Sequence, residues 1–170
     1  MTTLLQYHQQ QDIKPISNNN EHKYLQIAFE VENNELRKLL GAAFLLDIQK
    51  NPTNYTDLLS GVEFDCNGST MVHRGLYFVL AYLNYAKYIG ESFVNDTFTG
   101  FVQKNRTESE NVSEGTIKRL MNENRTIALD EFSVIKDYLN ENSDTYTLWN
   151  CSTQKKLFTP RITTLRKTFY

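Results

Sequence analysis

The 170-residue sequence is poor in the residues that build disulfide frameworks, zinc sites and membrane spans. It has two cysteines, Cys66 and Cys151, and no Cys/His spacing typical of zinc ligands. No apolar run approaches the ~18 residues of a membrane span, and residues 1–20 hold no apolar leader segment. With 40% hydrophobic residues the chain can build its own core. We therefore expect one domain, made in a reducing compartment, with no membrane partner.

Sequence motifs for catalysis are also missing. The chain contains no G-x-x-x-x-G-K loop, no G-x-G-x-x-G, no H-E-x-x-H and no G-x-S-x-G. His73, which lies beside Arg74, is interpreted as a capping or surface residue rather than a general base. Cys66 is interpreted as a structural cysteine rather than a reactive thiol. The sequence thus predicts a protein that is not an enzyme, with no catalytic residue, cofactor or metal.

The charge is unevenly distributed along the chain, although the net charge is only −2. Residues 152–170 contain five basic side chains and no acidic one, so the remaining residues carry 13 basic and 20 acidic side chains, or −7. An acidic body disfavours nucleic-acid binding, because contacts with phosphate supply most of the non-specific affinity. The basic tail is either a solvated end or a docking segment.

Hydrophobic spacing predicts a mainly α fold: a helical bundle of four to five helices with a small β-hairpin and extended N- and C-terminal arms. Residues 1–20 are rich in Gln and Asn, and we expect an arm that is disordered or ordered only by a neighbour. The helical domain is expected over residues 21–150. In the basic tail, residues 151–170, Pro160 and a β-branched run favour an extended chain.

Within this domain, the helix over residues 73–94 is apolar on nearly every side, which indicates the centre of a bundle or a surface covered by another subunit. The pair Asn67-Gly68 between alternating apolar residues predicts a hairpin over 62–72. Other helices are expected over 24–31, from a cap at Asn33 or Asn34 to Lys50 with Gly41 inside it, from Pro52 to Gly61, and from a cap at Ser113 to Asn142.

The segment between the last two helices, residues 95–112, is polar and longer than most connections. A connection of this length indicates a functional loop, a long hairpin or disorder.

Five segments follow one another in a fixed order within residues 24–149. They are ELRKLLGAAFLLDIQKN, YTDLLSGVEF, HRGLYFVLAYLNYAKYI, TFTGFVQKN and YLNENSDTYTLW. Together they resemble the head-tail connector (adaptor) proteins of tailed bacteriophages, including crAss-like and other phages of Bacteroides-type hosts. The order and spacing of the segments are more specific than any one of them.

This resemblance implies a structural subunit of the phage neck, made in the cytoplasm of the host bacterium and located in the virion. Such proteins form a ring, usually of twelve copies, below the portal protein. The ring extends the channel for the genomic duplex DNA, which passes without sequence-specific binding, and it meets a further neck, stopper or tail protein.

The resemblance also suggests where partners would bind. The loop over 95–112 would face the channel or a neighbouring subunit, through Phe98, Gly100, Phe101, Lys104 and Arg106. The basic tail departs from the family pattern and is expected to dock on the portal or neck, through Lys155, Lys156, Phe158, Arg161, Arg166, Lys167 and Tyr170.

Three alternatives remain open at this point. One of them is a hydrolase with an unrecognised site. The chain could be a small nucleic-acid-binding protein for DNA packaging or regulation that uses the basic tail. It could also be an ordinary monomer of four or five helices with frayed ends, which composition does not exclude.

Overall fold

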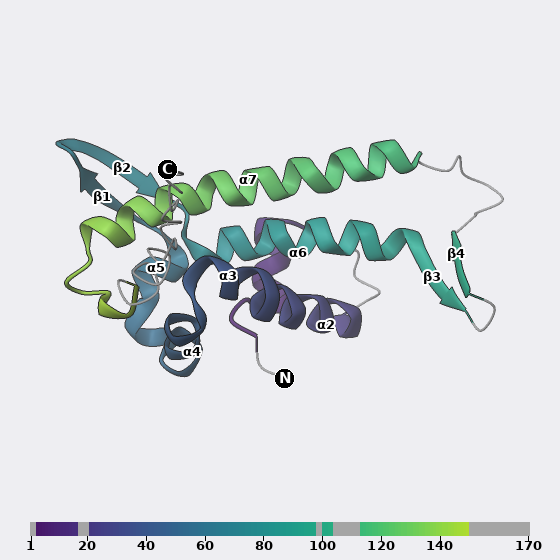
Figure 1. Ribbon diagram of the computed structural model, residues 1–170, viewed down its shortest axis with the longest axis horizontal. Coiled ribbons are helices and arrows are strands. Elements are labelled where there is room, and N and C mark those ends of the chain that lie inside the picture. Colours follow the sequence, from purple (N-terminus) through teal and green to yellow (C-terminus); the bar gives the residue numbers. More distant parts are fainter. Residues whose placement is uncertain (1–2, 17–20, 98–99, 104–112, 150–170) are drawn as a thin grey trace, which may run out of the picture.

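The computed structural model describes residues 3–16, 21–97, 100–103 and 113–149, with side chains left out for residues 92–97 and 100–103. The prediction of a mainly α fold with a small β-hairpin is confirmed. Figure 1 shows α6 (Gly75–Phe93) and α7 (Glu114–Glu141) running antiparallel along the long axis, with α2 (Glu21–Val31) on the other side of α6.

Helix α6 lies at the centre of the molecule, as its all-round hydrophobicity predicts. It contacts α1, α2, α5 and α7. Its inward side chains Leu76, Leu80 and Leu83 are fully or almost fully buried. Because α6 has neighbours on most sides within one chain, most of its apolar surface needs no second subunit to cover it.

Helix α7 follows its predicted pattern closely. The hydroxyl of Ser113 accepts a hydrogen bond from the backbone N–H of Thr116 at 3.2 Å, which confirms the predicted cap. With 28 residues the helix is about 42 Å long. Its predicted apolar stripe faces the core, from Ile117 through Phe132 to Leu139.

The region before residue 50 differs from the prediction of a helix capped at Asn33 or Asn34. Helix α2 continues without a break through a π-helical turn, η2 (Glu32–Leu36), into α3 (Arg37–Leu40). The Asn33 side chain donates to the Phe29 carbonyl within the helix, so Asn33 does not cap the start of a new helix. The break occurs instead at Gly41, with φ 86° and ψ 154°, before α4 (Ala42–Lys50). A residue with a Cβ rarely adopts this backbone conformation.

The next segment agrees with the prediction. A 3₁₀ turn, η3 (Pro52–Tyr55), leads into α5 (Thr56–Ser60), which ends at Gly61. Strands β1 (Val62–Cys66) and β2 (Ser69–His73) pair antiparallel. Asn67 and Gly68 connect them with φ values of 51° and 77°, the left-handed geometry that a two-residue hairpin turn requires.

The N-terminal residues are not an arm that needs a neighbour, because residues 3–16 pack on the chain's own core. They contain α1 (Tyr7–Ile13), and Leu5 is fully buried. The backbone N–H of Leu4 donates to the buried carboxylate of Glu32 at 2.7 Å, and the Tyr24 hydroxyl donates to the Leu5 carbonyl at 3.0 Å. Burial raises the pKa of Glu32. Composition predicted disorder because it cannot show these long-range hydrogen bonds.

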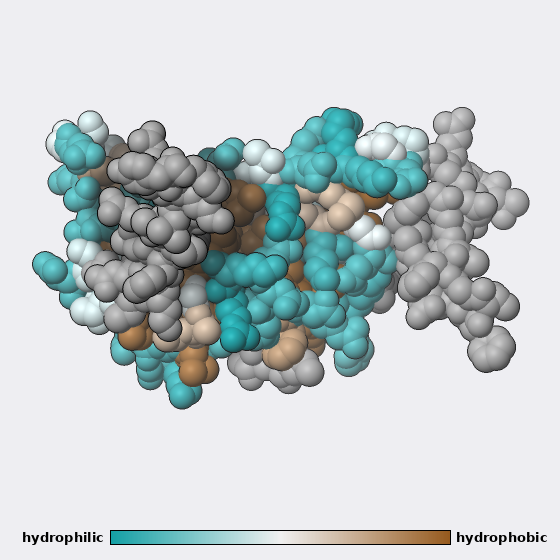
Figure 2. All heavy atoms as spheres, in the orientation of Figure 1, coloured by the Kyte–Doolittle hydropathy of each residue, from teal (hydrophilic) through white to brown (hydrophobic). Residues whose placement is uncertain are grey.

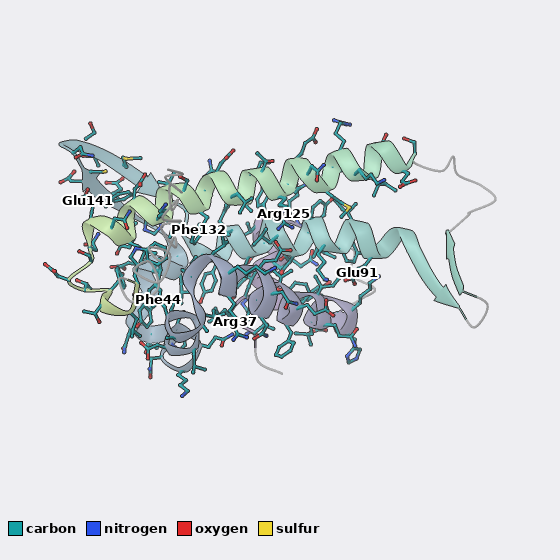
Figure 3. All side chains as sticks on the ribbon, in the orientation of Figure 1. Arg37, Phe44, Glu91, Arg125, Phe132 and Glu141 are labelled. Carbon is teal, nitrogen blue, oxygen red and sulfur yellow. The ribbon has the colours of Figure 1, made fainter. Side chains whose placement is uncertain are left out.

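Ion pairs connect the helical layers at the surface. Arg125 of α7 pairs with Glu35 of η2 at 3.0 Å, and Lys87 of α6 pairs with Glu30 of α2 at 2.7 Å. Lys87 also pairs with Glu91 of the same helix at 3.3 Å. Figure 3 shows where Arg125 of α7 and Glu91 of α6 lie. Exposed pairs of this kind contribute about 0–1 kcal/mol each, so the buried apolar core carries most of the stability.

Candidate functional site

The structure places two of the residues that the resemblance assigned to partner contacts. Gly100 and Phe101 lie in β4 (Gly100–Gln103), which pairs antiparallel with β3 (Val94–Thr97). The part of the loop that is described is therefore a hairpin, one of the three alternatives left open by its length. Figure 1 shows this hairpin extending beyond the end of the helical bundle.

The other predicted partner residues lie outside the described ranges. These are Phe98, Lys104 and Arg106 in the loop, and Lys155, Lys156, Phe158, Arg161, Arg166, Lys167 and Tyr170 in the tail.

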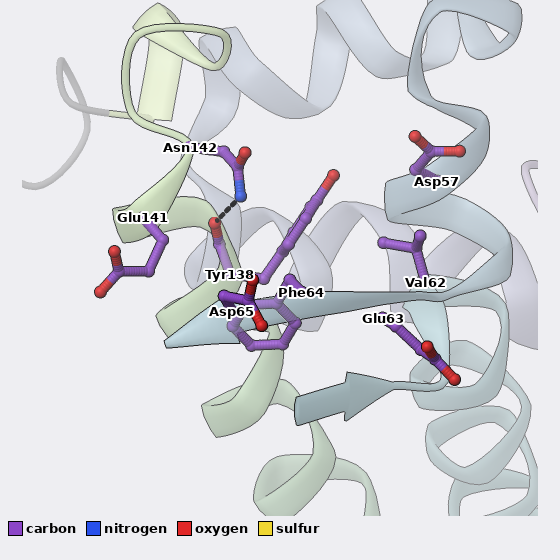
Figure 4. Close-up of a pocket in the computed structure, with 8 residues that line it drawn as sticks. All are labelled: Asp57, Val62, Glu63, Phe64, Asp65, Tyr138, Glu141 and Asn142. Atoms are coloured by element: carbon purple, nitrogen blue, oxygen red, sulfur yellow. Dashed lines mark hydrogen bonds between the residues drawn. The ribbon is translucent and has the colours of Figure 1, made fainter. Parts of the chain in front are cut away.

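A polar cleft of about 360 Å³ lies at the opposite end of the molecule, where β1 meets α5 and the end of α7. Figure 4 shows Asp57 and Glu63 on one side of this cleft and Glu141 with Asn142 on the other, with Phe64 and Tyr138 between them. We call it the acidic cleft. Its lining residues are Asp57, Val62, Glu63, Phe64, Asp65, Tyr138, Glu141 and Asn142.

The carboxylates of the acidic cleft form no ion pair with any side chain of the described part of the chain. Asp65 accepts a hydrogen bond from the Thr70 hydroxyl at 3.0 Å, and Glu141 accepts one from the Cys66 thiol at 3.7 Å. The cleft therefore presents uncompensated negative charge, which attracts cationic groups. Within the described ranges, no three His, Cys, Asp or Glu side chains are grouped so that they could hold a metal ion.

Sequence reasoning missed the acidic cleft because its residues come from three separate elements. Asp57 belongs to α5, Glu63 and Asp65 to β1, and Glu141 to the end of α7. No local spacing connects these positions, and only the packing of the β1–β2 hairpin on α7 brings them together.

Cys66 lies at the edge of this region and is half-buried. Its pKa is raised, first by lost hydration and then by the neighbouring Glu141 carboxylate. A raised pKa keeps the side chain as the neutral thiol, which is the less nucleophilic form. This environment agrees with a structural cysteine.

His73 is buried behind the acidic cleft, with 1% of its surface exposed, so its interpretation as a capping or surface residue is wrong. Its ring packs on Tyr138, with ring centroids 4.4 Å apart, and on Phe64 at 5.9 Å. Neither ring nitrogen has a hydrogen-bond partner among the described residues. The hairpin register could have predicted this burial. Phe64 lies opposite Met71, and His73 lies two residues beyond Met71 on the same, inward face.

We expect His73 to make the stability of the protein depend on pH. Burial lowers its pKa, although Glu131 and Asp57 oppose this effect. The unfolded chain then binds the proton more readily, so the contribution of His73 to stability is constant well above about pH 6.5 and falls as the pH drops below that value. One such group changes the free energy of unfolding by at most about 1.4 kcal/mol per pH unit.

Denaturant unfolding between about pH 5 and 8 tests this expectation. The substitution His73→Phe should remove this part of the pH dependence, and it also removes two buried polar atoms without partners. His22→Gln, at an exposed position of α2, is the control and should leave the dependence unchanged. Equal slopes for the wild type and His73→Phe would contradict the assignment.

No helix in the described ranges combines the length and the apolar character needed to cross a bilayer.

Residues 36–159 match the model of a protein family described as a family of unknown function (DUF6712). The match covers nearly three quarters of the chain and includes the whole acidic cleft. No curated protein and no solved structure shows a significant match to the chain.

Proposed function

Because the chain belongs to DUF6712, a family of unknown function, we propose its role from its own residues: it is a structural, non-enzymatic subunit of the neck of a tailed phage. In this role it forms a ring below the portal protein that extends the DNA channel and joins the head to the tail. The partners are other copies of the chain, the portal protein and a further neck, stopper or tail protein.

The observation that carries this proposal is the geometry of the α6–α7 connection. The two long helices run antiparallel, and the β3–β4 hairpin between them extends away from the bundle (Figure 1). An isolated two-stranded hairpin is marginally stable in water. A neighbouring subunit in a ring would support it, which agrees with the role that the resemblance implies for this segment.

The surface of the described residues is compatible with contacts between subunits. Figure 2 shows a largely hydrophilic face, with hydrophobic residues gathered at its lower edge over α4. Leu46 of α4 is 51% exposed and Phe29 of α2 is 40% exposed. Large apolar side chains on a monomer surface often mark interaction sites when they are grouped.

The charge of the body also suits a channel wall. Outside residues 152–170 the chain carries a net charge of −7. Each fixed phosphate contact adds affinity for DNA, so a wall along which duplex DNA slides needs few of them. An acidic body therefore keeps the affinity of the channel wall for the passing DNA low.

Deletion of residues 153–170 tests the proposed docking role of the basic tail. The truncated chain retains Trp149, which packs on the core, so we expect it to fold like the full chain. It should no longer join the portal ring of the phage that encodes it, as measured by pull-down and sedimentation of the mixture. A full-length variant in which glutamine replaces the five basic tail residues separates charge from length. Unchanged portal binding by the truncated chain would contradict this role.

A second function is favoured by one feature, the basic tail of five cations without an acidic residue. Such a tail could bind nucleic acid in DNA packaging or regulation. A gel shift with duplex DNA that weakens steeply with salt would support that function. If no gel shift occurs at low salt, the nucleic-acid function is excluded, and portal binding remains the test of the neck proposal.

A further inference from the structure

A row of aromatic rings and cations lies along one face of α6. The rings of Phe78 and Tyr82 have centroids 4.5 Å apart at an angle of 31°. The guanidinium of Arg74 lies 4.7 Å from the centre of the Phe78 ring. The ammonium of Lys14 lies 5.0 Å from the centre of the Tyr82 ring and 4.7 Å from that of Tyr85. We call these five residues the aromatic ridge.

Two separate parts of the sequence build the aromatic ridge. Phe78, Tyr82 and Tyr85 recur at spacings of four and three residues, which places them on one side of α6. Lys14 comes from the N-terminal segment, directly after α1. The buried Gln10 side chain holds this segment in place, since its amide donates to the Lys14 carbonyl at 2.7 Å and to the Ala81 carbonyl at 3.1 Å.

The aromatic ridge remains accessible to a partner. Its three rings are half-buried, and the Arg74 side chain is 64% exposed. A cavity of about 310 Å³ adjoins the ridge at Arg74 and Phe78, between the end of α5 and α1. Half-buried aromatic side chains next to an exposed arginine and a concave pocket are the composition typical of the centres of protein interfaces.

The charge of the aromatic ridge indicates the chemistry of its partner. Arg74 and Lys14 are cations whose positive charge is only partly compensated, by Glu131 at 3.8 Å from Arg74 and by Asp12 in the adjoining cavity. A complementary surface therefore supplies carboxylates. The acidic cleft of the same molecule has such a surface, with Asp57 and Glu63 exposed and in no ion pair within the described residues.

We infer that the aromatic ridge of one copy of the chain docks against the acidic cleft of the next copy. This contact joins two different surfaces, so a pair of copies keeps one free cleft on the first copy and one free ridge on the second. Repetition of such a contact produces a closed ring when the rotation closes, and an open filament when it does not. The inference rests on the proposed ring, and it names the surfaces that form it.

Charge reversal in the full chain tests the contact, with mass photometry and sedimentation velocity as the readouts. Lys14→Glu with Arg74→Glu reverses the ridge, and Glu63→Lys with Glu141→Lys reverses the cleft. Each pair should weaken self-association by about tenfold or more, because it places like charges opposite each other. The control pair, Lys118→Glu with Arg119→Glu on an exposed face of α7, should leave self-association unchanged.

Mixing the two variants gives a sharper result than either alone. The ridge-reversed chain keeps an intact cleft, and the cleft-reversed chain keeps an intact ridge. The mixture should associate again with the two variants alternating, because the intact cleft meets the intact ridge and the glutamates of the reversed ridge meet the lysines of the reversed cleft. This outcome also shows that both variants are folded, since each must supply one working surface.

Four results would overturn the inference. The first is a wild-type chain that stays monomeric up to about 100 µM. The second is self-association that persists after ridge reversal, and the third is self-association that is lost when only residues 153–170 are deleted. The fourth is binding of single-stranded DNA that ridge reversal abolishes, which would make the ridge a nucleic-acid surface. Portal binding is measured separately. A chain that self-associates through the ridge but ignores the portal would refute the proposed neck function and leave this contact standing.

Discussion

Replacing Gly75 with alanine should lower the free energy of unfolding by about 3 kcal/mol or more, one of the two largest effects expected from a single substitution in this protein. Gly75 has φ 82°, a conformation that costs a residue with a Cβ about 1–2 kcal/mol. An added Cβ would also overlap the carbonyl oxygen of Leu59, and it would lie 2.5 Å from the Gly61 nitrogen and 2.6 Å from the Ser60 carbon.

These contacts arise because two backbone segments cross without side chains between them. Gly61 ends α5 and Gly75 begins α6, so the crossing sets the base of the β1–β2 hairpin. A Cβ on Gly61 would meet the backbone of His73 and Arg74 in the same way. Backbone atoms cannot move aside as a flexible side chain can, so overpacking here separates α5 from α6.

Gly68→Ala is the matched control. Gly68 also has positive φ, 77°, but no heavy atom lies within 4 Å of an added Cβ. Its substitution should therefore cost only the conformational strain, about 1–2 kcal/mol. Urea unfolding of both variants measures the difference. Equal losses for Gly68→Ala and Gly75→Ala would show that the crossing is not close-packed.

The substitution Trp149→Ala should cost about 3–5 kcal/mol, the range for truncating a buried tryptophan. Trp149 is 3% exposed and its ring packs near Phe44, with centroids 6.4 Å apart. Tyr146 packs on the same ring at 6.2 Å, and its hydroxyl bonds that of Tyr138 at 3.0 Å. The residues after α7 thus return to close the core between α4 and α7.

The substitution Asn140→Ala measures the contribution of the Trp149 hydrogen bond separately from that of the buried Trp149 side chain. The indole N–H of Trp149 donates to the Asn140 side-chain oxygen at 2.9 Å, and removing this partner should cost about 1–3 kcal/mol. Thermal and urea unfolding of both variants provide the comparison. A loss for Trp149→Ala no larger than that for Asn140→Ala would contradict the burial argument. If the expected order holds, truncations of the basic tail should keep residue 149.

The acidic cleft and the aromatic ridge share one reason for escaping sequence analysis. Each combines residues separated by dozens of positions: Asp57 with Glu141 in the cleft, and Lys14 with Tyr82 in the ridge. The periodicity of a helix or strand reports which side of that element is apolar. It does not report which other element lies against the polar side.

The sequence by itself determined the local features of this protein. The apolar spacing of α6 and α7, the cap at Ser113, the Asn67-Gly68 turn and the stop at Gly61 all depend on neighbours within a few residues. The corresponding forces act over one turn of helix or one hairpin, so the residues that specify them are adjacent in the chain.

Only the tertiary structure decided the features that depend on distant partners. It packed residues 3–16 on the core through Glu32 and Tyr24, and it buried His73 between Phe64 and Tyr138. In both cases contacts across the fold outweighed a local preference of about 1 kcal/mol, because burial and long-range hydrogen bonds contribute more than propensity does.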